Sequence, residues 1–359
     1  MIRILIVDDS ALMRKSLTGI FAAEGDFEIA VARDGLEALR QAESFGPDVV
    51  TLDVNMPGLD GLACLDRLML QHPVPVVMLS AMTEHGAEET LKALAIGAVD
   101  FVAKPAGVAS LSTEAISGEL VAKVRAAAAV RLPRARRLAE RMRLRRVAQS
   151  PAVGEPVAAP VRRSLGTIGA PGLVLIGTST GGPPALDLLL TSLPETLPWP
   201  IVIAQHMPAS FTGSFARRLD QISALSVAEV LGPTPLLPGR VYIAHGGGDI
   251  MISSRAGQVI ATAAPAQADY PWRPSVDRLV RTAQQILPPA KLLAILLTGM
   301  GSDGAAAMAD LREAGGHTIA ESRETAVVWG MPGELVNRGG ASEVLPLHEI
   351  PGRVAELLT

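Results

Sequence analysis

The sequence predicts an α/β protein made of two doubly wound parallel-sheet domains joined by a linker. Apolar strands alternate with amphipathic helices over residues 1–105 and again over 172–359, and the alternation is lost in between. At 359 residues the chain is also longer than one hydrophobic core usually serves. We therefore expect a first domain at 1–125, a linker at 126–168 and a second domain at 169–359.

The expected strands are continuous apolar runs, which are typical of parallel strands buried on both faces. In the first domain they span 2–7, 28–32, 48–52, 75–79 and 100–104. In the second domain the clearest runs span 172–179, 200–206, 239–245 and 291–299, and each leads into a turn that contains glycine or proline. Helical patterns lie between the strands, so right-handed crossovers would build open sheets with helices on both faces.

The composition is that of a soluble globular protein, with 48% hydrophobic and 19% charged residues. The apolar stretch at the start is too short for a signal peptide, and the run from Leu292 to Met300 is far short of the ~20 residues that span a bilayer. The single cysteine, Cys64, lies in an apolar helical run and cannot form an internal disulfide. These observations favour a cytoplasmic protein in a reducing compartment.

The net charge of −4 conceals a strongly basic segment. Between Lys123 and Arg163 there are twelve lysines and arginines against Glu140 and Glu155, so this segment carries +10 and the rest of the chain −14. The first half of the segment can be helical, and its second half, rich in proline and alanine, predicts an extended chain. It is either a solvated spacer or a docking segment for an acidic partner.

Polar residues follow several strands of the first domain: Asp8, Asp9, Asp53, Ser80 and Lys104. We expect these side chains to meet, because the carboxyl ends of parallel strands lie at one edge of a sheet. Three neighbouring carboxylates repel one another, and a hard cation such as Mg²⁺ with oxygen ligands relieves this repulsion. A carboxylate can also act as a nucleophile toward a phosphoryl group, whose oxygens the lysine and the serine hydroxyl can bind.

The motifs VDDS, LDVNMPGLDG and GAVDFVAKP, with the Ser80-Ala81 pair, resemble those of response-regulator receiver domains. The resemblance implies a flavodoxin-like receiver in which Asp53 accepts phosphate from a histidine kinase. The Mg²⁺ ligands that it implies are Asp8, Asp9, Asp53 and the carbonyl of Asn55. The residues that it implies as phosphate sensors are Ser80 and Lys104.

In the second domain a strand runs into the sequence GTSTGG and then into a helical segment. This matches the nucleophile-elbow pattern, in which glycines permit a sharp turn that exposes the hydroxyl of the central serine, here Ser179. The N–H groups at the start of the following helix would suit an oxyanion. Glycine-rich turns between strand and helix also bind phosphates, but the G-x-G-x-x-G pattern of dinucleotide sites is absent from this turn.

A nucleophilic serine needs a base, and the base needs an orienting acid. Two histidines, His206 and His245, follow strands of this domain, whereas His317 precedes a strand and should lie at the opposite edge. Asp303 follows a strand on a glycine-rich loop and is the candidate acid. The order Ser…His…Asp differs from that of α/β-hydrolases, so a conventional esterase fold is not expected. The residues alone leave both histidines as candidates for the base.

The motifs GTSTGG, QHMP, WRPSVD, LTGMGSDG and VVWGMP resemble the series found in the CheB chemotaxis methylesterases, over nearly all of 172–340. The resemblance implies a Rossmann-like catalytic domain without a cofactor, in which Ser179 is the nucleophile, His206 the general base and Asp303 its orienting carboxylate. It also implies an oxyanion hole formed by backbone N–H groups near Thr180 and Met300.

The implied function is that of a phosphorylation-activated protein-glutamate methylesterase. It would hydrolyse glutamyl methyl esters on chemoreceptors and deamidate receptor glutamines, and a CheA-type histidine kinase would be its phosphodonor. Nucleic acid and membrane insertion are not expected. Three departures leave the substrate detail open: His245 stands where proline is usual, Asp249 where histidine is common, and Ser322-Arg323 where Gln-Asp is more usual. His245 is otherwise expected to be a hydrogen-bonded loop residue.

Two other functions remain open from the sequence. One is a DNA-binding response regulator that uses the arginine-rich segment, although no helix-turn-helix pattern follows the first domain. The other is an adaptor with a catalytically silent esterase domain, which the departures near His245 and Arg323 would suit.

Overall fold

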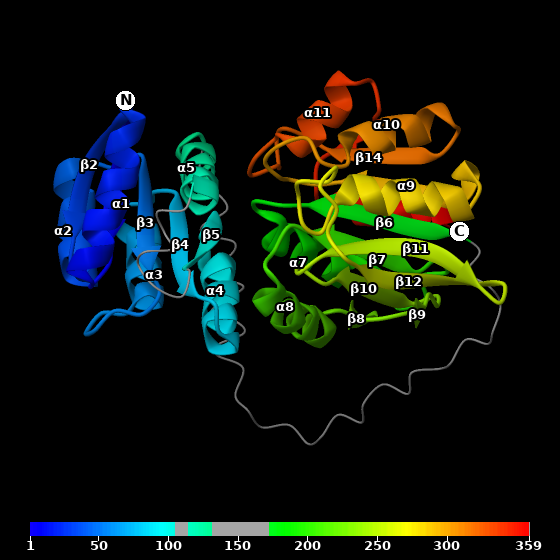
Figure 1. The fold of residues 1–359 in the computed structure, drawn as a ribbon, viewed down its shortest axis with the longest axis horizontal. Helices are drawn as coiled ribbons and strands as arrows, with labels where there is room; N and C mark the ends of the chain where they lie inside the picture. Colours follow the sequence, from blue (N-terminus) through cyan, green and yellow to red (C-terminus); the bar gives the residue numbers. More distant parts are fainter. Residues whose placement is uncertain (105–113, 131–171, 359) are drawn as a thin grey trace, which may run out of the picture.

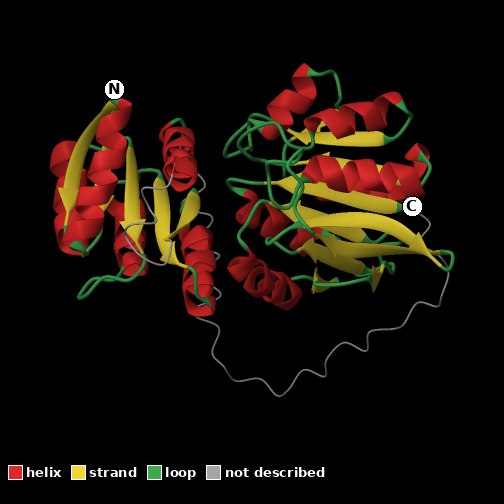
Figure 2. Ribbon diagram, viewed as in Figure 1, coloured by secondary structure: helices red, strands yellow, loops and turns green. Residues whose placement is uncertain are grey.

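The computed structural model describes residues 1–104, 114–130 and 172–358. It contains two α/β domains, each with a parallel sheet covered by helices, so the predicted fold class is confirmed (Figures 1 and 2). Most of the predicted linker at 126–168 lies outside the described residues. In the described part of the chain, no helix is both long enough and apolar enough to cross a membrane.

The first domain is a five-stranded parallel sheet, in the order β2-β1-β3-β4-β5 among the described residues. Its strands are β1 (Ile2–Val7), β2 (Phe27–Ala32), β3 (Val49–Asp53), β4 (Val76–Ala81) and β5 (Asp100–Lys104). Its helices are α1 (Ala11–Glu24), α2 (Gly35–Phe45), α3 (Gly61–Gln71), α4 (Glu84–Ile96) and α5 (Glu114–Ala128). All five predicted strands are present. β1 and β5 have the predicted bounds, and the ends of the other three differ from them by at most two residues.

Local sequence signals fix the starts of these helices. The side chains of Ser10, Asp34, Asp60 and Thr83 each accept a hydrogen bond from the N–H group three residues further on, which caps α1 to α4. Along the strands, alternate residues face opposite sides of the sheet. In β1, Ile4 therefore packs against α1 and α5. The next residue, Leu5, packs on the opposite face against α2, α3 and α4.

The second domain is a seven-stranded parallel sheet, in the order β15-β14-β13-β6-β7-β10-β8 among the described residues. Its strands are β6 (Leu173–Thr178), β7 (Ile201–Gln205), β8 (Ser226–Val230), β10 (Arg240–Ala244), β13 (Leu292–Leu296), β14 (His317–Glu321) and β15 (Glu343–Leu345). Its helices are α7 (Gly182–Ser192), α8 (Ala209–Ile222), α9 (Val276–Ile286), α10 (Ala305–Glu313), α11 (Met331–Asn337) and α12 (Ile350–Leu358), with the short 3₁₀-helix η2 (Pro289–Lys291).

A small antiparallel sheet in this domain is not in the sequence prediction. It consists of β11 (Asp249–Arg255), β12 (Gln258–Ala264) and the two-residue β9 (Thr234–Pro235). The first two strands form a hairpin whose turn residues, Ala256 and Gly257, both have positive φ values of 50° and 78°. Such values are typical of the tight turns that match the twist of a hairpin.

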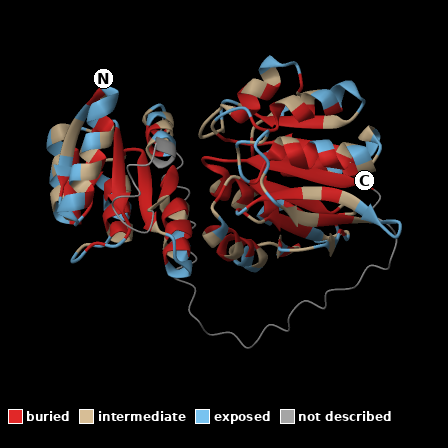
Figure 3. Ribbon diagram, in the orientation of Figure 1, coloured by how far each residue is buried: buried red, intermediate tan, exposed pale blue. Residues whose placement is uncertain are grey.

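Buried apolar residues fill the space between the sheets and their helices (Figure 3). In β6, Val174 and Ile176 pack toward α7, α8 and α12, whereas Leu173 and Leu175 pack toward α9 and α10. The apolar cluster on the α7, α8 and α12 face continues into the first domain. Phe101 of β5 packs against Phe211 of α8 with ring centroids 4.5 Å apart. The helices α4 and α8 lie side by side across this junction (Figure 1).

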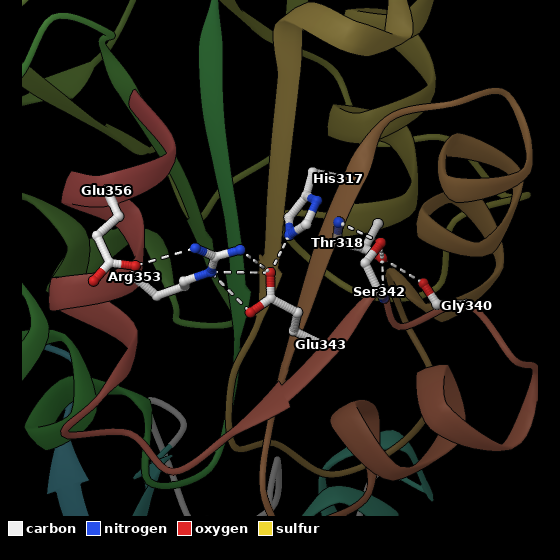
Figure 4. Close-up of polar contacts among 7 residues, drawn as sticks. All are labelled: His317, Thr318, Gly340, Ser342, Glu343, Arg353 and Glu356. Carbon is white, nitrogen blue, oxygen red and sulfur yellow. Dashed lines mark hydrogen bonds and ion pairs between the residues drawn. The ribbon is translucent and has the colours of Figure 1, made fainter. Parts of the chain in front are cut away.

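The outer edge of the second sheet is tied to the last helix by a charged network (Figure 4). The carboxylate of Glu343 in β15 accepts hydrogen bonds from the guanidinium of Arg353 in α12 and contacts His317 Nε2 at 2.6 Å. The bonds from Arg353, joined by the contact with His317, hold the pKa of Glu343 below its ordinary value. His317 is the first residue of β14 and therefore lies at the amino edge of the sheet, as its sequence position predicts.

Candidate active site and phosphorylation site

An acidic cluster lies at the carboxyl edge of the first sheet. Asp8 and Asp9 follow β1 and Asp53 ends β3, and one oxygen from each of the three carboxylates lies within 4.8 Å of the others. The ammonium group of Lys104 lies 2.8 Å from Asp8 Oδ2 and 2.8 Å from Asp53 Oδ2. The structure thus brings together four of the residues that the sequence placed at this edge.

Ser80 and Asn55 lie at this edge with different contacts. The Ser80 hydroxyl donates to the carbonyl of Gly86 at 3.0 Å, so it is directed toward the start of α4. Asn55 is exposed, and its backbone N–H donates to Asp53 Oδ1 at 3.3 Å.

The electrostatics of the acidic cluster suit a divalent cation. Burial raises the pKa of Asp53, and the nearby charge of Asp8 raises it further, although Lys104 acts in the opposite direction. A set of hard carboxylate oxygens at this spacing is the chemistry that Mg²⁺ selects. The residues present therefore fit a bound divalent cation.

The candidate nucleophile, Ser179, lies directly after β6 at the carboxyl edge of the second sheet. Its N–H donates to the carbonyl of Thr298 at 3.0 Å, and the Thr178 hydroxyl donates to the same carbonyl at 2.8 Å, which holds the turn against the loop after β13. Gly181 caps α7 with a φ of 78°, a backbone conformation that favours glycine. The sequence predicts this strand, turn and helix, and the structure has all three.

The candidate base, His206, lies one strand away, directly after β7. Its Nε2 is 2.9 Å from Asp303 Oδ2, and its ring stacks on that of Trp272 with centroids 5.3 Å apart and planes 4° apart. The other ring nitrogen, Nδ1, is buried and has no hydrogen-bond partner among the described residues. This nitrogen is therefore the one available to take a proton.

The candidate acid, Asp303, lies on the loop between β13 and α10, and its carboxylate is directed at the N-terminus of α9. Its Oδ2 accepts from the N–H of Val276 at 2.7 Å, and its Oδ1 accepts from the N–H of Asp277 and the hydroxyl of Ser275, each at 3.0 Å. Burial alone would raise the pKa of Asp303, but the hydrogen bond and charge of His206, together with the backbone N–H groups, bring it below its ordinary value. Asp303 is therefore ionised, and His206 donates from Nε2.

The loop after β13 passes closely over the nucleophile. A side chain at Gly299 would lie 2.9 Å from the Cβ of Ser179 and 2.3 Å from the sulfur of Met331, so only glycine fits there. The backbone N–H groups of Thr180 and Met300 have no acceptor among the described residues. Two free donors beside a serine can bind a developing oxyanion.

The structure explains the unusual residues His245 and Asp249. His245 Nδ1 lies 2.8 Å from Glu229 Oε1, so His245 is a hydrogen-bonded loop residue as expected. Asp249 is fully buried and pairs with Arg278 of α9, whose Nη1 lies 2.6 Å from Asp249 Oδ2. Arg323 lies over the ring of Trp329 at 5.1 Å from its centroid.

Two residues near the site have no role in the sequence prediction. Ser275 lies within the WRPSVD motif, so that motif was the available signal for it. Asp100, the first residue of β5, accepts a hydrogen bond from the hydroxyl of Thr180, next to the candidate nucleophile. This contact joins the two domains, and such a pairing between distant segments has no local sequence signal.

Contacts within the first domain hold Asp100 at its junction with the second domain. Lys123 of α5 lies 3.4 Å from the Asp100 carboxylate and donates to the carbonyl of Phe101 at 2.7 Å. Burial lowers the pKa of Lys123, but the charges of Asp100 and Glu119 outweigh it, so that the pKa is raised. Val327, from the loop before α11, packs against the apolar cluster under α1 and α5 of the first domain.

Comparison with known proteins agrees with the two domains and their order. The CheB methylesterase family model matches residues 174–354, and the response regulator receiver domain model matches residues 4–116. The chain is 54% identical to protein-glutamate methylesterase/protein-glutamine glutaminase 2 of Rhodopseudomonas palustris, over 99% of this chain and 98% of that protein. It is 50% identical to protein-glutamate methylesterase/protein-glutamine glutaminase 3 of Rhodospirillum rubrum, over 99% of this chain and 95% of that one.

Among solved structures, the CheB methylesterase catalytic domain of Thermotoga maritima is 41% identical to this chain. It matches with a TM-score of 0.50 and covers 52% of this chain and 98% of the other. With both domains matched along the chain, this protein belongs to the CheB methylesterase family and carries a response-regulator receiver domain.

Proposed function

We propose that this chain is a phosphorylation-activated methylesterase that hydrolyses glutamyl methyl esters on chemoreceptors to glutamate and methanol. Its relatives are named for protein-glutamate methylesterase and protein-glutamine glutaminase activities, which supports receptor deamidation as a second activity. The observation that carries the proposal is the bond between His206 Nε2 and Asp303 Oδ2, at a strand end adjacent to Ser179.

In the proposed mechanism Ser179 attacks the ester carbonyl while His206 Nδ1 takes the proton of the hydroxyl. The bond from Nε2 to the ionised Asp303 leaves Nδ1 as the proton acceptor and stabilises the imidazolium that forms. As the bond to the methoxy oxygen breaks, His206 returns the proton and methanol leaves. Water then attacks the acyl-enzyme with His206 as base again, which frees the glutamate and restores the serine. The same steps on a glutamine amide release ammonia.

The negative charge that develops on the carbonyl oxygen needs donors that are fixed in advance. The N–H groups of Thr180 and Met300 are proposed to supply them, since neither has another acceptor among the described residues. Removal of one such donor from other serine hydrolases costs about 100- to 1000-fold in turnover.

The receiver is proposed to restrict access to this site until it is phosphorylated. The contact between Asp100 and Thr180 places a receiver carboxylate directly beside one of the proposed oxyanion donors. A negative charge there would oppose the formation of an oxyanion. Separation of the domains would remove this effect.

Asp53 is the proposed phosphate acceptor, with a CheA-type histidine kinase as donor. Mg²⁺ would be held by Asp8, Asp9, Asp53 and the carbonyl of Asn55, and when bound it supplies positive charge for the phosphoryl oxygens. Lys104, already in contact with Asp53, is proposed to bind the phosphate, and the Ser80 hydroxyl would turn from Gly86 to do the same.

The decisive experiment measures methanol release from methylated chemoreceptor membranes, with and without acetyl phosphate and Mg²⁺. We expect release by the wild-type chain, an increase with acetyl phosphate, and no release by Ser179→Ala. A folded wild-type chain that released no methanol in either condition would instead be a silent adaptor.

A further inference from the structure

The WRPSVD segment, residues 272–277, contacts both the proposed base and the proposed acid. Trp272 stacks on the ring of His206, and Ser275 donates a hydrogen bond from its hydroxyl to Asp303 Oδ1 at 3.0 Å. The N–H groups of the next two residues donate to the same carboxylate. The proposed mechanism gives no role to the serine hydroxyl.

The hydroxyl of Ser275 both donates and accepts a hydrogen bond inside the protein. The residue is 1% exposed, its Oγ accepts from the N–H of Arg278 at 3.3 Å, and its hydrogen is directed to Asp303. The backbone N–H of Ser275 donates to Asp249 Oδ1 at 2.8 Å, and Asp249 is fixed by its buried pair with Arg278. The serine therefore has little freedom to turn away from the carboxylate.

Each carboxylate oxygen of Asp303 accepts two hydrogen bonds, one from a backbone N–H and one from a side chain. Oδ2 receives His206 and a backbone N–H, while Oδ1 receives a backbone N–H and the Ser275 hydroxyl. Loss of the hydroxyl would leave Oδ1 with a single donor, so the carboxylate could rotate about its χ2 bond. Rotation would misalign Oδ2, and with it the ring of His206.

We propose that Ser275 is a positioning residue of the catalytic centre, which acts through Asp303 on His206. This inference rests on the proposed function of the triad. Ser275 also caps α9, and a test must therefore separate the cap from the hydrogen bond to Asp303.

The variants Ser275→Gly and Ser275→Thr separate the helix cap from the hydrogen bond to Asp303. Glycine is accepted at a helix N-cap with only a few tenths of a kcal/mol lost relative to serine, but it cannot donate a side-chain hydrogen bond. Threonine keeps both the cap and the hydroxyl. Ser275→Cys gives a further comparison, because its thiol has nearly the same shape but is a weak donor.

For Ser275→Gly we expect kcat for methanol release about tenfold below wild type with an unchanged KM. Rotation of the carboxylate reduces the fraction of molecules in which Oδ2 holds His206, and this lowers kcat. In the molecules that keep this bond, the carboxylate has lost one donor, is more basic and stabilises the imidazolium of His206 more strongly. The acid limb of their pH profile therefore shifts to higher pH, by about one unit. The charged groups around Asp303 besides His206 include Asp269, Asp277 and Arg281, which line the same cavity, and the Asp249–Arg278 pair. All of them are kept in this variant.

The measurements use the full chain activated with acetyl phosphate and Mg²⁺, with thermal unfolding followed in parallel. We expect Ser275→Thr to restore kcat and the pH profile, and Ser275→Cys to fall between wild type and glycine. If Ser275→Gly, or Ser275→Cys where glycine does not fold, keeps the wild-type kcat and acid limb, Ser275 is only a helix cap. An inactive wild-type chain would instead reject the proposed function.

Discussion

The hydroxyl of Thr180 donates a hydrogen bond to the carboxylate of Asp100, which joins the residue after Ser179 to the first residue of the receiver strand β5. The last residue of the same strand, Lys104, lies 2.8 Å from Asp53 Oδ2. A single five-residue strand therefore connects the proposed phosphate acceptor with the contact at the active site. A shift of β5 when Lys104 binds a phosphate would act directly on Asp100.

This relationship predicts that Asp100→Ala raises the basal activity. The substitution removes the hydrogen bond from Thr180 across the contact between the domains, so the receiver binds the catalytic domain less tightly. A hydrogen bond to a charged group contributes about 1.5–3 kcal/mol, and we expect at least about a tenfold increase in methanol release without phosphodonor. Asp66→Ala, which changes an exposed carboxylate on α3, is the matched control. Equal basal rates in both variants would contradict the prediction.

Asp53→Asn tests the proposed phosphate acceptor, which contacts Lys104 at the other end of β5. Without its carboxylate, residue 53 cannot form an acyl phosphate, so acetyl phosphate and Mg²⁺ should no longer increase methanol release. Basal release should remain, because Asp53 lies in the receiver and does not contact Ser179. Stimulation equal to that of wild type would show that the phosphate acceptor lies elsewhere.

The fold class and the strand ends that carry the candidate site residues could be predicted from the sequence, because they rest on local pattern. The choice of His206 over His245 as the base came instead from the resemblance to a family. The strand ends that carry Asp53, Ser179 and His206 are marked by apolar runs and glycines, which act over a few residues. The hairpin of β11 and β12 was missed, since its strands carry polar residues on the exposed side and lack a continuous apolar run.

The remaining features depend on contacts between distant segments. Asp100 and Thr180 are 80 residues apart in the chain, and Ser275 and Asp303 are 28 apart. Neither pair follows from periodicity or spacing, because tertiary packing alone brings the residues together. The tautomer of His206, with Nε2 on the carboxylate and Nδ1 free, is likewise a result of geometry.

Cys64 is predicted to be unreactive in the folded protein. It is fully buried, and burial raises the pKa of its thiol to about 12, so almost no thiolate exists at neutral pH. A thiol reagent at pH 8 should label the native chain only at the rate of unfolding and label the denatured chain rapidly. Fast labelling of the native chain would show that α3 opens under these conditions.

The ionised state of Asp303 predicts a specific pH dependence of stability. Because its pKa in the folded protein lies below the ordinary value, the ionised carboxylate stabilises the fold at pH values above about 4. This contribution is lost as the pH falls from there through the folded pKa. The difference in free energy of unfolding between wild type and Asp303→Asn should therefore shrink as the pH falls below about 4. A difference that stays constant over that range would mean that the fold does not lower the pKa of Asp303.

The buried pair of Asp249 and Arg278 predicts strong coupling between two positions near the site. Arg278→Ala leaves the carboxylate buried without its charged partner, which typically costs about 3–5 kcal/mol of stability. The double variant Asp249→Ala/Arg278→Ala removes both charges, and we expect it to lose much less than the sum of the single variants. Urea unfolding of the four proteins measures this coupling. Simple additivity would mean that the two charges do not form a pair in solution.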